Sequence, residues 1–377
     1  MASGDDKFYL QFEIIFNILK RLPVKSIVRF QCVCKEWRDL FKSQSFIDEQ
    51  VRHSVHEDPS LLLHAYDYNY MRPTLRLLNR KMETVDVLSV PSNDCFKDGW
   101  RIIGSCNGWV CVESWSIRLL FLWNPVLREV REIPQSKNKG ISVFGFGFSS
   151  MVNNYKIVRF SDRYQDEEGI EYHIPIVEVY SLCTDSWKEL EFGPLQNIKI
   201  TSTNAASADG TIVWLGVGVV DYTSPVLVSF DIATEVFTLT PIPSTVSRAL
   251  PTTLGVYQNK IAISGHLCGS HSMDIWVMEQ VDGESGKHFS CTQAYSVDIF
   301  SYALDVCCTW KNGIVCFDKE RKAGREGKPK YHLKLFNLTD KEWKEFPNIS
   351  SAHDCCAGFS YGGSLVSLQP PGSIALL

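Results

Sequence analysis

Three metal-ligating residues lie close together in the segment GHLCGSH, which contains His266, Cys268 and His271. Zinc takes such imidazole and thiolate ligands, but a structural zinc site needs a fourth ligand in tetrahedral geometry. The glycine and serine residues of this segment are instead typical of a surface loop. No C-x-x-C spacing occurs in the chain, which excludes a zinc ribbon or a thioredoxin motif. We therefore expect no metal site.

Paired carboxylates could do acid–base chemistry, and Glu167-Glu168 is such a pair. It lies in the polar run DRYQDEEG, which is typical of a solvated loop. The segment SADGTIVW (207–214) is similar to the Asp-box of sialidases, S-x-D-x-G-x-T-W, but Gly210 follows Asp209 directly and the pattern occurs once. A turn between two strands explains it better. Spacing singles out no Ser-His-Asp set and no phosphate-binding glycine loop, so we expect a non-catalytic protein without a cofactor.

The composition is that of a globular protein. The chain has 377 residues, 45% hydrophobic and 21% charged, enough for one large core or for a small domain and a large one. A net charge of −5 argues against general nucleic-acid binding. No apolar run reaches the roughly 18 residues of a membrane span, and the acidic residues in MASGDDKFYL do not fit a secretory signal. We expect a cytosolic or nuclear protein whose 13 cysteines are reduced.

Three short helices are predicted at the N-terminal end, and their apolar surface is too large for so small a unit. The first, over residues 8–22, has one apolar stripe at Phe8, Phe12, Ile15, Leu19 and Leu22 and a second at Ile14 and Ile18. Pro23 ends this helix and starts a second one that reaches Phe30, and a third runs from about Val33 to Phe41. About 40 residues are at the lower limit of autonomous folding. The surplus apolar surface therefore predicts a partner, which is either the rest of the chain or another protein.

The residues of this unit carry a family pattern. FEIIFNILKRLPVKSIVRFQCVCKEWRDLF closely resembles the F-box of plant proteins, the adaptor-binding module of cullin-based ubiquitin ligases. The family pattern I-L-x-R-L-P-V-K-S-[LI]-x-R-F-x-C-V-x-K-x-W is matched from Ile18 to Trp37. The resemblance implies that a Skp-type adaptor is bound by Leu10, Ile14, Ile18, Leu22, Pro23 and Val24, with Lys25 as a charge at the rim. It places Ile15, Leu19, Val28, Val33 and Trp37 in the core of the unit. Gln11 departs from the pattern, because the family usually has a proline there, in the adaptor contact.

From Ser60 onward, short β-branched and aromatic runs alternate with turn signals such as CNGW and ADGT. Five segments repeat an apolar pair, a short polar residue and, six positions later, a large apolar residue. The polar residues are Asn79, Asn124, Ser181, Asp231 and Asn337, and their partners are Val85, Val130, Trp187, Phe237 and Trp343. We expect each polar side chain to bond the backbone of a turn and each partner to begin the return strand, facing the core.

These repeats predict a β-propeller. With Val277 as a sixth, weaker mark, they lie 45 to 60 residues apart, close to the length of propeller blades. We expect about six blades, with seven or a β-sandwich as alternatives, and a ring closed by the strand YGGSLVSL at 361–368. The phrases GSCNGWVCV, LWNPVLRE and VEVYSLCTDSWKEL resemble the F-box-associated (kelch-like) interaction domain of plant F-box proteins. The expected organisation is α+β, with an F-box at 8–48, a connector at 49–59 and a β-domain at 60–377.

Together these resemblances imply the substrate receptor of a Skp-cullin-F-box ubiquitin ligase. It would bind the adaptor, and through it the cullin and RING subunits, with its F-box, and a target protein with loops of the β-domain. A carbohydrate- or small-molecule-binding propeller with a weak F-box is the alternative. Family members include receptors of the style ribonuclease in self-incompatibility, but the sequence does not identify the target.

Overall fold

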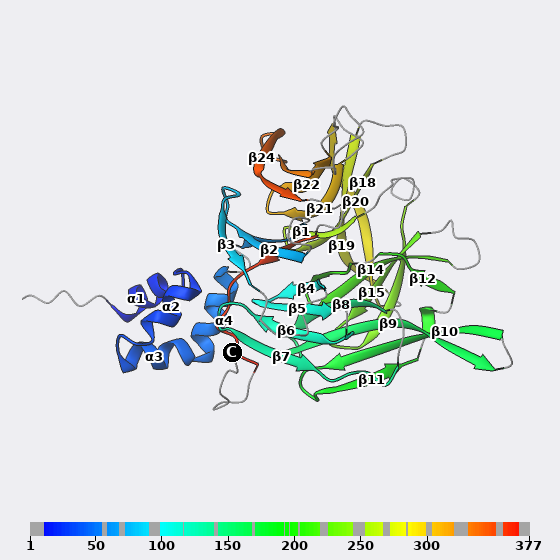
Figure 1. The fold of residues 1–377 in the computed structure, drawn as a ribbon, viewed down its shortest axis with the longest axis horizontal. Coiled ribbons are helices and arrows are strands. Elements are labelled where there is room, and N and C mark those ends of the chain that lie inside the picture. The colour runs from blue at the N-terminus through cyan, green and yellow to red at the C-terminus, as the bar shows by residue number, and fades with distance from the viewer. Residues whose placement is uncertain are drawn as a thin grey trace, which may run out of the picture.

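The computed structural model describes residues 11–54, 59–67, 72–89, 99–115, 117–138, 142–167, 170–191, 193–195, 197–202, 204–218, 225–243, 253–266, 272–283, 286–298, 304–319, 331–351 and 357–368. These residues form four α-helices, on one side of the molecule, followed by six β-sheets (Figure 1). Among them, no helix is both long enough and apolar enough to cross a membrane.

The helices make up the helical unit, which consists of α1 (Phe12–Leu19), α2 (Val24–Phe30), α3 (Lys35–Lys42) and α4 (Gln44–Arg52). Pro23 precedes α2 with a φ of −53°, which its ring favours. The Cys34 Sγ accepts a hydrogen bond from the Trp37 N–H at the start of α3 (3.4 Å). The Ser43 Oγ does the same for Phe46 in α4 (3.4 Å). Side chains thus satisfy backbone donors at the starts of α3 and α4.

The helical unit differs from the expected three helices in two ways. The first helix ends at Leu19, not Leu22, because residues 20–22 form a tighter turn in which the Leu22 N–H bonds to the Leu19 carbonyl. A fourth helix, α4, extends the unit past residue 48 to Arg52. It forms there because Phe46 and Gln50, one turn apart, are both buried against the rest of the protein. Phe8 and Leu10 lie outside the described residues.

Six antiparallel sheets form the blades of a propeller, as the repeats predicted. From the inner to the outer strand, blade 1 has β25 (Ala357–Tyr361), β1 (Ser60–Asp67), β2 (Arg72–Leu78) and β3 (Thr84–Leu88). Blade 2 has β4 (Trp100–Cys106), β5 (Trp109–Ser114), β6 (Leu120–Asn124) and β7 (Glu129–Ile133). Blade 3 has β8 (Ser142–Ser149), β9 (Asn154–Glu167), β10 (Ile170–Ser181) and β11 (Ser186–Leu190).

The other three blades complete the ring. Blade 4 has a divided inner strand, β12 (Ile198–Ile200) and β13 (Ala206–Ala208), followed by β14 (Thr211–Gly218), β15 (Pro225–Asp231) and β16 (Val236–Pro241). A 3-10 helix, Gly193–Leu195, precedes it. Blade 5 has β17 (Thr253–Tyr257), β18 (Lys260–His266), β19 (Ser272–Gly283) and β20 (Gly286–Asp298). Blade 6 has β21 (Leu304–Trp310), β22 (Gly313–Lys319), β23 (Tyr331–Asn337) and β24 (Glu342–Ser351).

A strand from near the end of the chain closes the ring, but it is not the strand expected. β25 pairs with β1 and places Leu62 opposite Phe359. The predicted strand at 361–368 is wrong except for its first residue. Tyr361 pairs with Ser60, the first residue of β1, so the ladder has no partner for the residues that follow. Residues 362–368 continue beyond the sheet without strand structure.

Four of the five repeated polar residues bond the turn between the third and fourth strands of their blade, as predicted. The prediction is wrong for Ser181, whose Oγ accepts a bond from the Asn154 Nδ2 (2.8 Å), while the Asn154 Oδ1 accepts the bond from the Cys183 N–H of that turn (3.2 Å). The Asn124 Oδ1 accepts hydrogen bonds from the Val126 and Leu127 N–H groups (3.1 and 3.2 Å). Asn79, Asp231 and Asn337 accept equivalent bonds in their blades. Each such turn saves backbone donors from being buried without a partner.

The apolar partners of these residues pack between blades, with one exception. Val130, Trp187, Phe237 and Trp343 each join a core cluster. Val85, in contrast, is 60% exposed, so the prediction that it faces the core is wrong. The register between β2 and β3 shifts at Leu77/Leu78, where Val85 is the extra residue. A bulge of this kind turns the extra side chain away from its neighbours.

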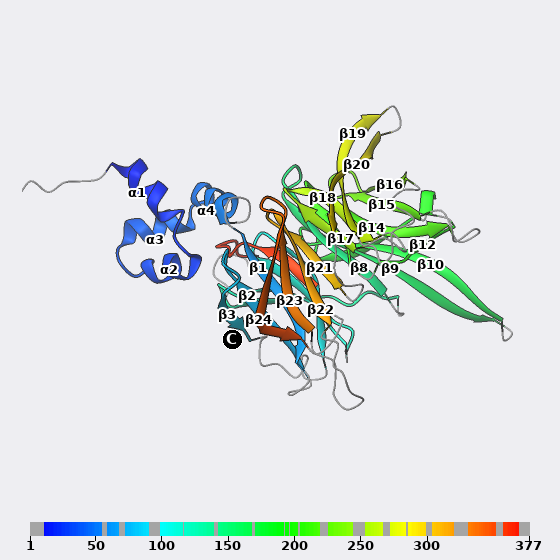
Figure 2. The ribbon, with the colours of Figure 1, turned by 90° about the horizontal axis from the view of Figure 1, so that it is seen from above.

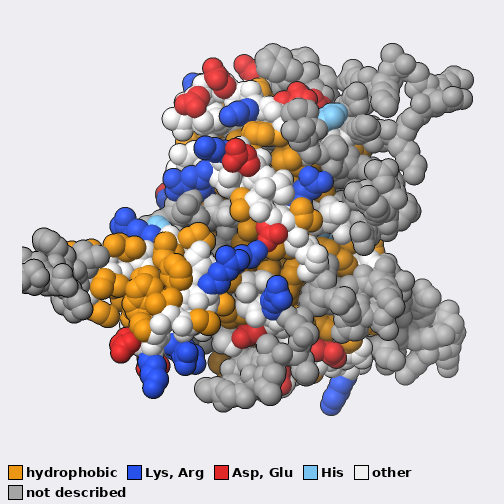
Figure 3. Space-filling view, turned by 60° about the vertical axis from the view of Figure 1, so that its left-hand side comes forward, with side chains coloured by type: hydrophobic (Ala, Val, Ile, Leu, Met, Phe, Trp, Pro, Cys, Tyr) orange, Lys and Arg blue, Asp and Glu red, His pale blue; other side chains and the backbone are white. Residues whose placement is uncertain are grey.

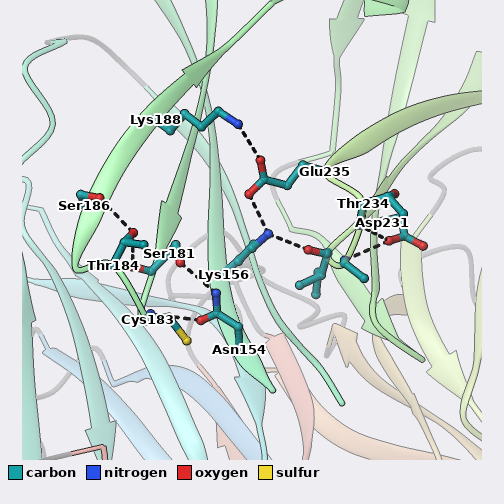
Figure 4. A network of polar contacts seen from close by, with 12 residues as sticks. Asn154, Lys156, Ser181, Cys183, Thr184, Ser186, Lys188, Asp231, Thr234 and Glu235 are labelled. Carbon is teal, nitrogen blue, oxygen red and sulfur yellow. Dashed lines mark hydrogen bonds and ion pairs between the residues drawn. The ribbon is translucent and has the colours of Figure 1, made fainter. Parts of the chain in front are cut away.

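Adjacent blades are also joined by buried polar contacts. The Lys156 Nζ, from β9 in blade 3, donates to the Ile232 carbonyl and to the Glu235 Oε1 in blade 4, both at 2.7 Å (Figure 4). The other Glu235 oxygen accepts a bond from the exposed Lys188 at 2.9 Å. Although partial burial acts to raise it, these two lysines hold the pKa of Glu235 below its ordinary value. The pair of charges therefore stabilises the junction of two blades.

The two ends of the blades form the two faces of the propeller, and the helical unit lies on one of them. In a four-stranded meander, the turn between strands one and two lies at the same end as the turn between strands three and four. We call this end of the blades the near face, and the opposite end the far face. The helical unit docks on the near face, since it packs on Val126 and Leu127 in the turn of blade 2. Figure 2 shows α4 between the other helices and the propeller.

Candidate functional site

The outer side of α1 is an apolar surface that no other described part of the chain covers. Phe12, Ile14 and Ile18 are 65, 44 and 51% exposed. Ile14 and Ile18 are one turn apart and lie on the same side of the helix. Ile15 and Leu19, also one turn apart, face the interior instead. Hydrophobic side chains gather over the helical unit in the space-filling view (Figure 3).

The corner between α1 and α2 belongs only partly to this exposed surface. Pro23 is exposed and Leu22 is half-buried in the core of the helical unit. Val24, expected in the adaptor-binding surface, is only 6% exposed. It packs in the cluster that contains Val126 and Leu365 of the propeller domain, so its burial corrects that expectation. The first residue of α2 is used to dock the helical unit and is not free for a partner.

Lys25 was expected as a charge at the rim of the surface, and it is exposed. Its Nζ forms an ion pair with the Asp86 carboxylate of β3, so this charge also links the helical unit to blade 1. Pairs this exposed contribute little free energy.

Four of the five predicted core residues pack in the core of the helical unit, and one does not. Leu19 is buried, and Ile15, Val28 and Trp37 pack around it as half-buried residues. Val33 is 61% exposed, so its prediction as a core residue is wrong. The third helix begins at Lys35, two residues later than predicted, and Val33 stands in the turn before it. It therefore falls outside the helical period that would have turned it inward.

The net charge of the helical unit is positive, whereas that of the whole chain is negative. Residues 11–54 hold eight Lys or Arg against five Asp or Glu, whereas the chain as a whole is net acidic. The Lys20 Nζ bonds to the Glu49 Oε2 at 3.1 Å, which ties α1 to α4. This bond holds the pKa of Glu49 below its ordinary value. Arg21, in the turn after α1, and Arg29, in α2, are exposed, so a partner with acidic groups around an apolar centre would suit the unit.

A cavity lined by the inner strands of all six blades, the central channel, could hold a small molecule. It has a volume of about 1200 Å³ and opens on the near face, beside Asp48 and Arg52 of α4. Neutral polar side chains of the near-face turns line it, among them Asn107, Asn153 and Asn259. No group of three or more His, Cys, Asp or Glu side chains suited to a metal occurs within the described ranges.

The described residues among the candidates for catalysis or metal binding lie in different blades. Asp209 and Gly210 form the turn between β13 and β14, with φ of 47° and 73°, as the turn interpretation of SADGTIVW predicted. Glu167 ends β9. His266 ends β18, but its side chain, Cys268, His271 and Glu168 lie outside the described residues.

Sequence reasoning missed three contributors to this region. Phe12 was placed in an apolar stripe but was not assigned to the adaptor-binding surface, yet it is the most exposed apolar residue of α1. Phe46, which is buried at the centre of the helical unit, was left in the segment after the third helix. Leu365 packs on the helices although it is more than 300 positions away in the chain. Helical spacing holds a signal for Phe46, whereas nothing local to residue 365 indicates its contact.

Comparison with known proteins finds two matching families. The F-box domain matches residues 10–49, and the F-box associated beta propeller domain matches residues 60–368. An F-box only protein of Arabidopsis thaliana is 27% identical over 372 residues, which is 95% of each chain. An F-box/kelch-repeat protein of the same plant is 26% identical over 379 residues, or 97% of this chain and 98% of the relative.

Solved structures give only a weak likeness. A chain of a nidogen/laminin complex has a TM-score of 0.44 at 10% identity, covering 81% of this chain and 99% of that one. A likeness at this level carries no argument about function.

Proposed function

Because the chain belongs to the family of F-box proteins with an F-box associated beta propeller domain, we propose that it is the substrate receptor of a Skp-cullin-F-box ubiquitin ligase. In this role the helical unit binds a Skp-type adaptor, and through it the cullin and RING subunits. The propeller binds the protein that is to be ubiquitinated. We place this activity in the cytosol or the nucleus.

The observation that carries the proposal is the uncovered apolar side of α1. Phe12, Ile14 and Ile18 remain exposed while the neighbouring stripe is buried. Leaving large apolar side chains in water forgoes about 1.5–3 kcal/mol each relative to full burial. Three on one short helix therefore form a surface suited to a protein partner. Pro23 and the half-buried Leu22 extend it at the corner, and Leu10 remains a proposed contact next to Gln11.

The target is proposed to bind on the far face. There the described residues that join the second and third strands of a blade, and those that join successive blades, lie at the end of the blades opposite the helical unit. Connecting segments of this kind often carry binding residues. Among the described residues of this face, Trp115 and Ile117 are 46 and 38% exposed. The Trp115 N–H donates to the Gly99 carbonyl at 3.0 Å, which anchors the backbone of this tryptophan. Exposed tryptophans on a fixed backbone are frequent binding hot spots.

The mechanism is one of proximity and needs no bond chemistry from this chain. A target held on the propeller and a ubiquitin-loaded enzyme held through the adaptor share one complex. Their effective concentration is then set by the geometry of the complex and not by diffusion. The work of this chain is therefore to bind two partners at once and to hold them at a fixed spacing.

Co-purification of the full chain with a Skp-type adaptor tests the proposal. We expect an Ile14→Asp, Ile18→Asp double variant to lose the adaptor, because both side chains would carry charge into the contact. Leu22 is unsuitable for this test, since it also packs in the core of the helical unit. A Met151→Asp, Val152→Asp variant is the matched control, because those residues are 82 and 45% exposed on the propeller. Adaptor retained by the first variant, or lost by the second, would refute the assignment of the surface.

The channel supports a second candidate, a binder of small polar molecules. Its volume of about 1200 Å³ and its amide-rich lining suit a neutral hydroxylated ligand such as a sugar. Saturable binding to a glycan array, with no adaptor binding by the same preparation, would favour this candidate over the ligase receptor.

A further inference from the structure

Residues 362–368, which we call the C-terminal clasp, run from the inner strand of blade 1 across blade 2. The Trp109 Nε1 donates to the Val366 carbonyl at 3.0 Å, and the buried Asn124 Nδ2 donates to the Ser364 and Val366 carbonyls, both at 3.2 Å. An Arg131 nitrogen donates to the Leu368 carbonyl at 3.1 Å. Side chains of blade 2 thus bond the clasp at three successive points along its backbone.

The same segment is held by the helical unit from the other side. The Gly363 carbonyl accepts hydrogen bonds from the Gln50 Nε2 at 3.1 Å and from the Ser54 Oγ at 2.9 Å. Leu365, 5% exposed, belongs to the cluster that contains Val24 and Phe46 of the helices. In Figure 1 the red C-terminal segment runs beside α4, between the helices and the blades.

The fit of the clasp is close on both sides. A Cβ at Gly363 would lie 3.2 Å from the Val126 Cγ2 and 3.4 Å from the Val24 Cγ2, so a larger residue would wedge the helices and blade 2 apart. A Cβ at Gly108 would lie 2.3 Å from the Ser364 Cβ. Close packing of this kind resists displacement, because each shift loses contacts on two sides.

Outside the clasp, the contacts between the helical unit and the propeller include the packing of Val126 and Leu127 on the apolar cluster of the helices and the Lys25–Asp86 ion pair. An exposed ion pair stabilises weakly, and units joined by a small interface move relative to each other by default.

We propose that the C-terminal clasp fixes the orientation of the helical unit on the propeller and so positions a bound target relative to the adaptor. Val24, Gly363 and Leu365 are then positioning residues, because Val24 is buried against the propeller and the other two belong to the clasp. The positioning of a target rests on the proposed function, whereas the fixed orientation of the helical unit does not.

Ion pairs of the chain itself supply the test. A zero-length carbodiimide joins a lysine to a carboxylate only where the two are in contact, and mass spectrometry quantifies each cross-link. The Lys25–Asp86 pair reports docking of the helical unit. The Lys20–Glu49 pair, at 3.1 Å within the helical unit, and the Lys260–Glu279 pair, at 2.5 Å within blade 5, report whether each part is folded.

Two variants of the full chain disturb the clasp in different ways. Gly363→Val inserts a side chain between Val24 and Val126, and Leu365→Asp places a charge in their cluster. In both we expect the Lys25–Asp86 cross-link to fall by about fivefold or more, because a buried site does not accept an unpaired charge or extra volume, while the two control cross-links stay at wild-type yield. Ser367→Ala, in the same segment, is the matched control. Its hydroxyl bonds Glu129 of blade 2 at 2.9 Å, and all three yields should stay unchanged.

The outcomes separate the inference from the proposed function. Unchanged Lys25–Asp86 yield in both clasp variants would overturn the inference. So would a parallel fall of all three yields, because residues 363 and 365 would then support folding in general.

For positioning, the adaptor complex is assembled with cullin and RING subunits, and the lysines of the propeller that acquire ubiquitin are mapped. We expect the clasp variants to bind the adaptor like wild type but to spread ubiquitin over more lysines; an unchanged pattern would overturn the positioning step. Wild-type chain that binds no adaptor would contradict the proposed function alone.

Discussion

Protonation of His64 should destabilise the blade that closes the ring. His64 lies in β1, opposite Ala357 of the closing strand β25, and is 9% exposed. Its ring packs on Trp100 with 4.9 Å between centroids, and its Nε2 has no hydrogen-bond partner among the described residues. Burial lowers the pKa of His64 from 6.5 to about 4. The folded protein therefore holds this side chain neutral at pH values where the unfolded chain protonates it.

The sign and size of the effect follow from this difference. Above pH 6.5 the imidazole is neutral in both states and the group has no effect on stability. As the pH falls below 6.5, the unfolded state binds more protons, so the free energy of unfolding drops until the pH passes about 4. One pKa unit corresponds to about 1.36 kcal/mol, so His64 should remove about 2 kcal/mol between pH 7.5 and pH 5.0 and about 3 kcal/mol by pH 4.

Urea denaturation followed by tryptophan fluorescence tests this at pH 7.5 and pH 5.0 in wild type and in a His64→Phe variant. Phenylalanine keeps an aromatic ring against Trp100 but does not titrate. Other groups titrate equally in both proteins, so the difference between them isolates residue 64. We expect wild type to lose about 2 kcal/mol more than the variant on going to pH 5.0. Equal losses in the two proteins would refute the reasoning.

Three further predictions concern single sites. Gln11 precedes α1 with φ −58° and ψ 144°, angles that proline adopts. Gln11→Pro should therefore leave the helix content unchanged and tighten adaptor binding by about two- to fivefold. Weaker adaptor binding of the variant in a titration would contradict this prediction. Lys156→Met should lower the free energy of unfolding by about 1–3 kcal/mol, because it removes a buried ion pair from Glu235. Lys188→Met, at a residue whose side chain is 67% exposed, should change the free energy of unfolding by less than about 0.5 kcal/mol. Equal urea midpoints of the two variants would contradict a buried junction. Trp115→Ala should reduce the recovery of labelled targets in proximity labelling with the adaptor surface disabled, and Val236→Ala, 55% exposed on blade 4, should not; equal recovery would remove Trp115 from the target site.

The parts of the fold that were predicted from the sequence are those encoded by local chemistry. In four blades the polar residue at the end of the third strand bonds a turn a few positions away, so Asn124 and Asp231 mark their blades in the sequence itself. The start of the second helix at Pro23 likewise depends on local residues. The two apolar stripes of α1 were predicted from the helical spacing of their residues. Only the packing of the other helices shows which of these stripes faces outward.

The parts that were missed depend on residues far away in the chain. Val24 was assigned to the surface because the family pattern places it beside Pro23, and its burial requires Leu365 of the clasp. The closing strand was predicted to begin at residue 361, four residues after its actual start at Ala357. Its position is set by its pairing with β1, where Ser60 pairs with Tyr361, and not by the residues around 361. Val33 was misplaced for a local reason, since a start of α3 two residues earlier would have turned it inward.

Equilibrium binding of the purified full chain to a Skp-type adaptor tests the central claim most directly. The account predicts a saturable one-to-one complex. It also predicts that the Ile14→Asp, Ile18→Asp variant binds about a thousandfold more weakly. The exposed half of each isoleucine would lose its burial and each new carboxylate would have to be desolvated, which together cost about 4 kcal/mol. The Met151→Asp, Val152→Asp variant should bind like wild type. No saturable binding by the wild-type chain, or equal affinity of wild type and the α1 variant, would contradict the account.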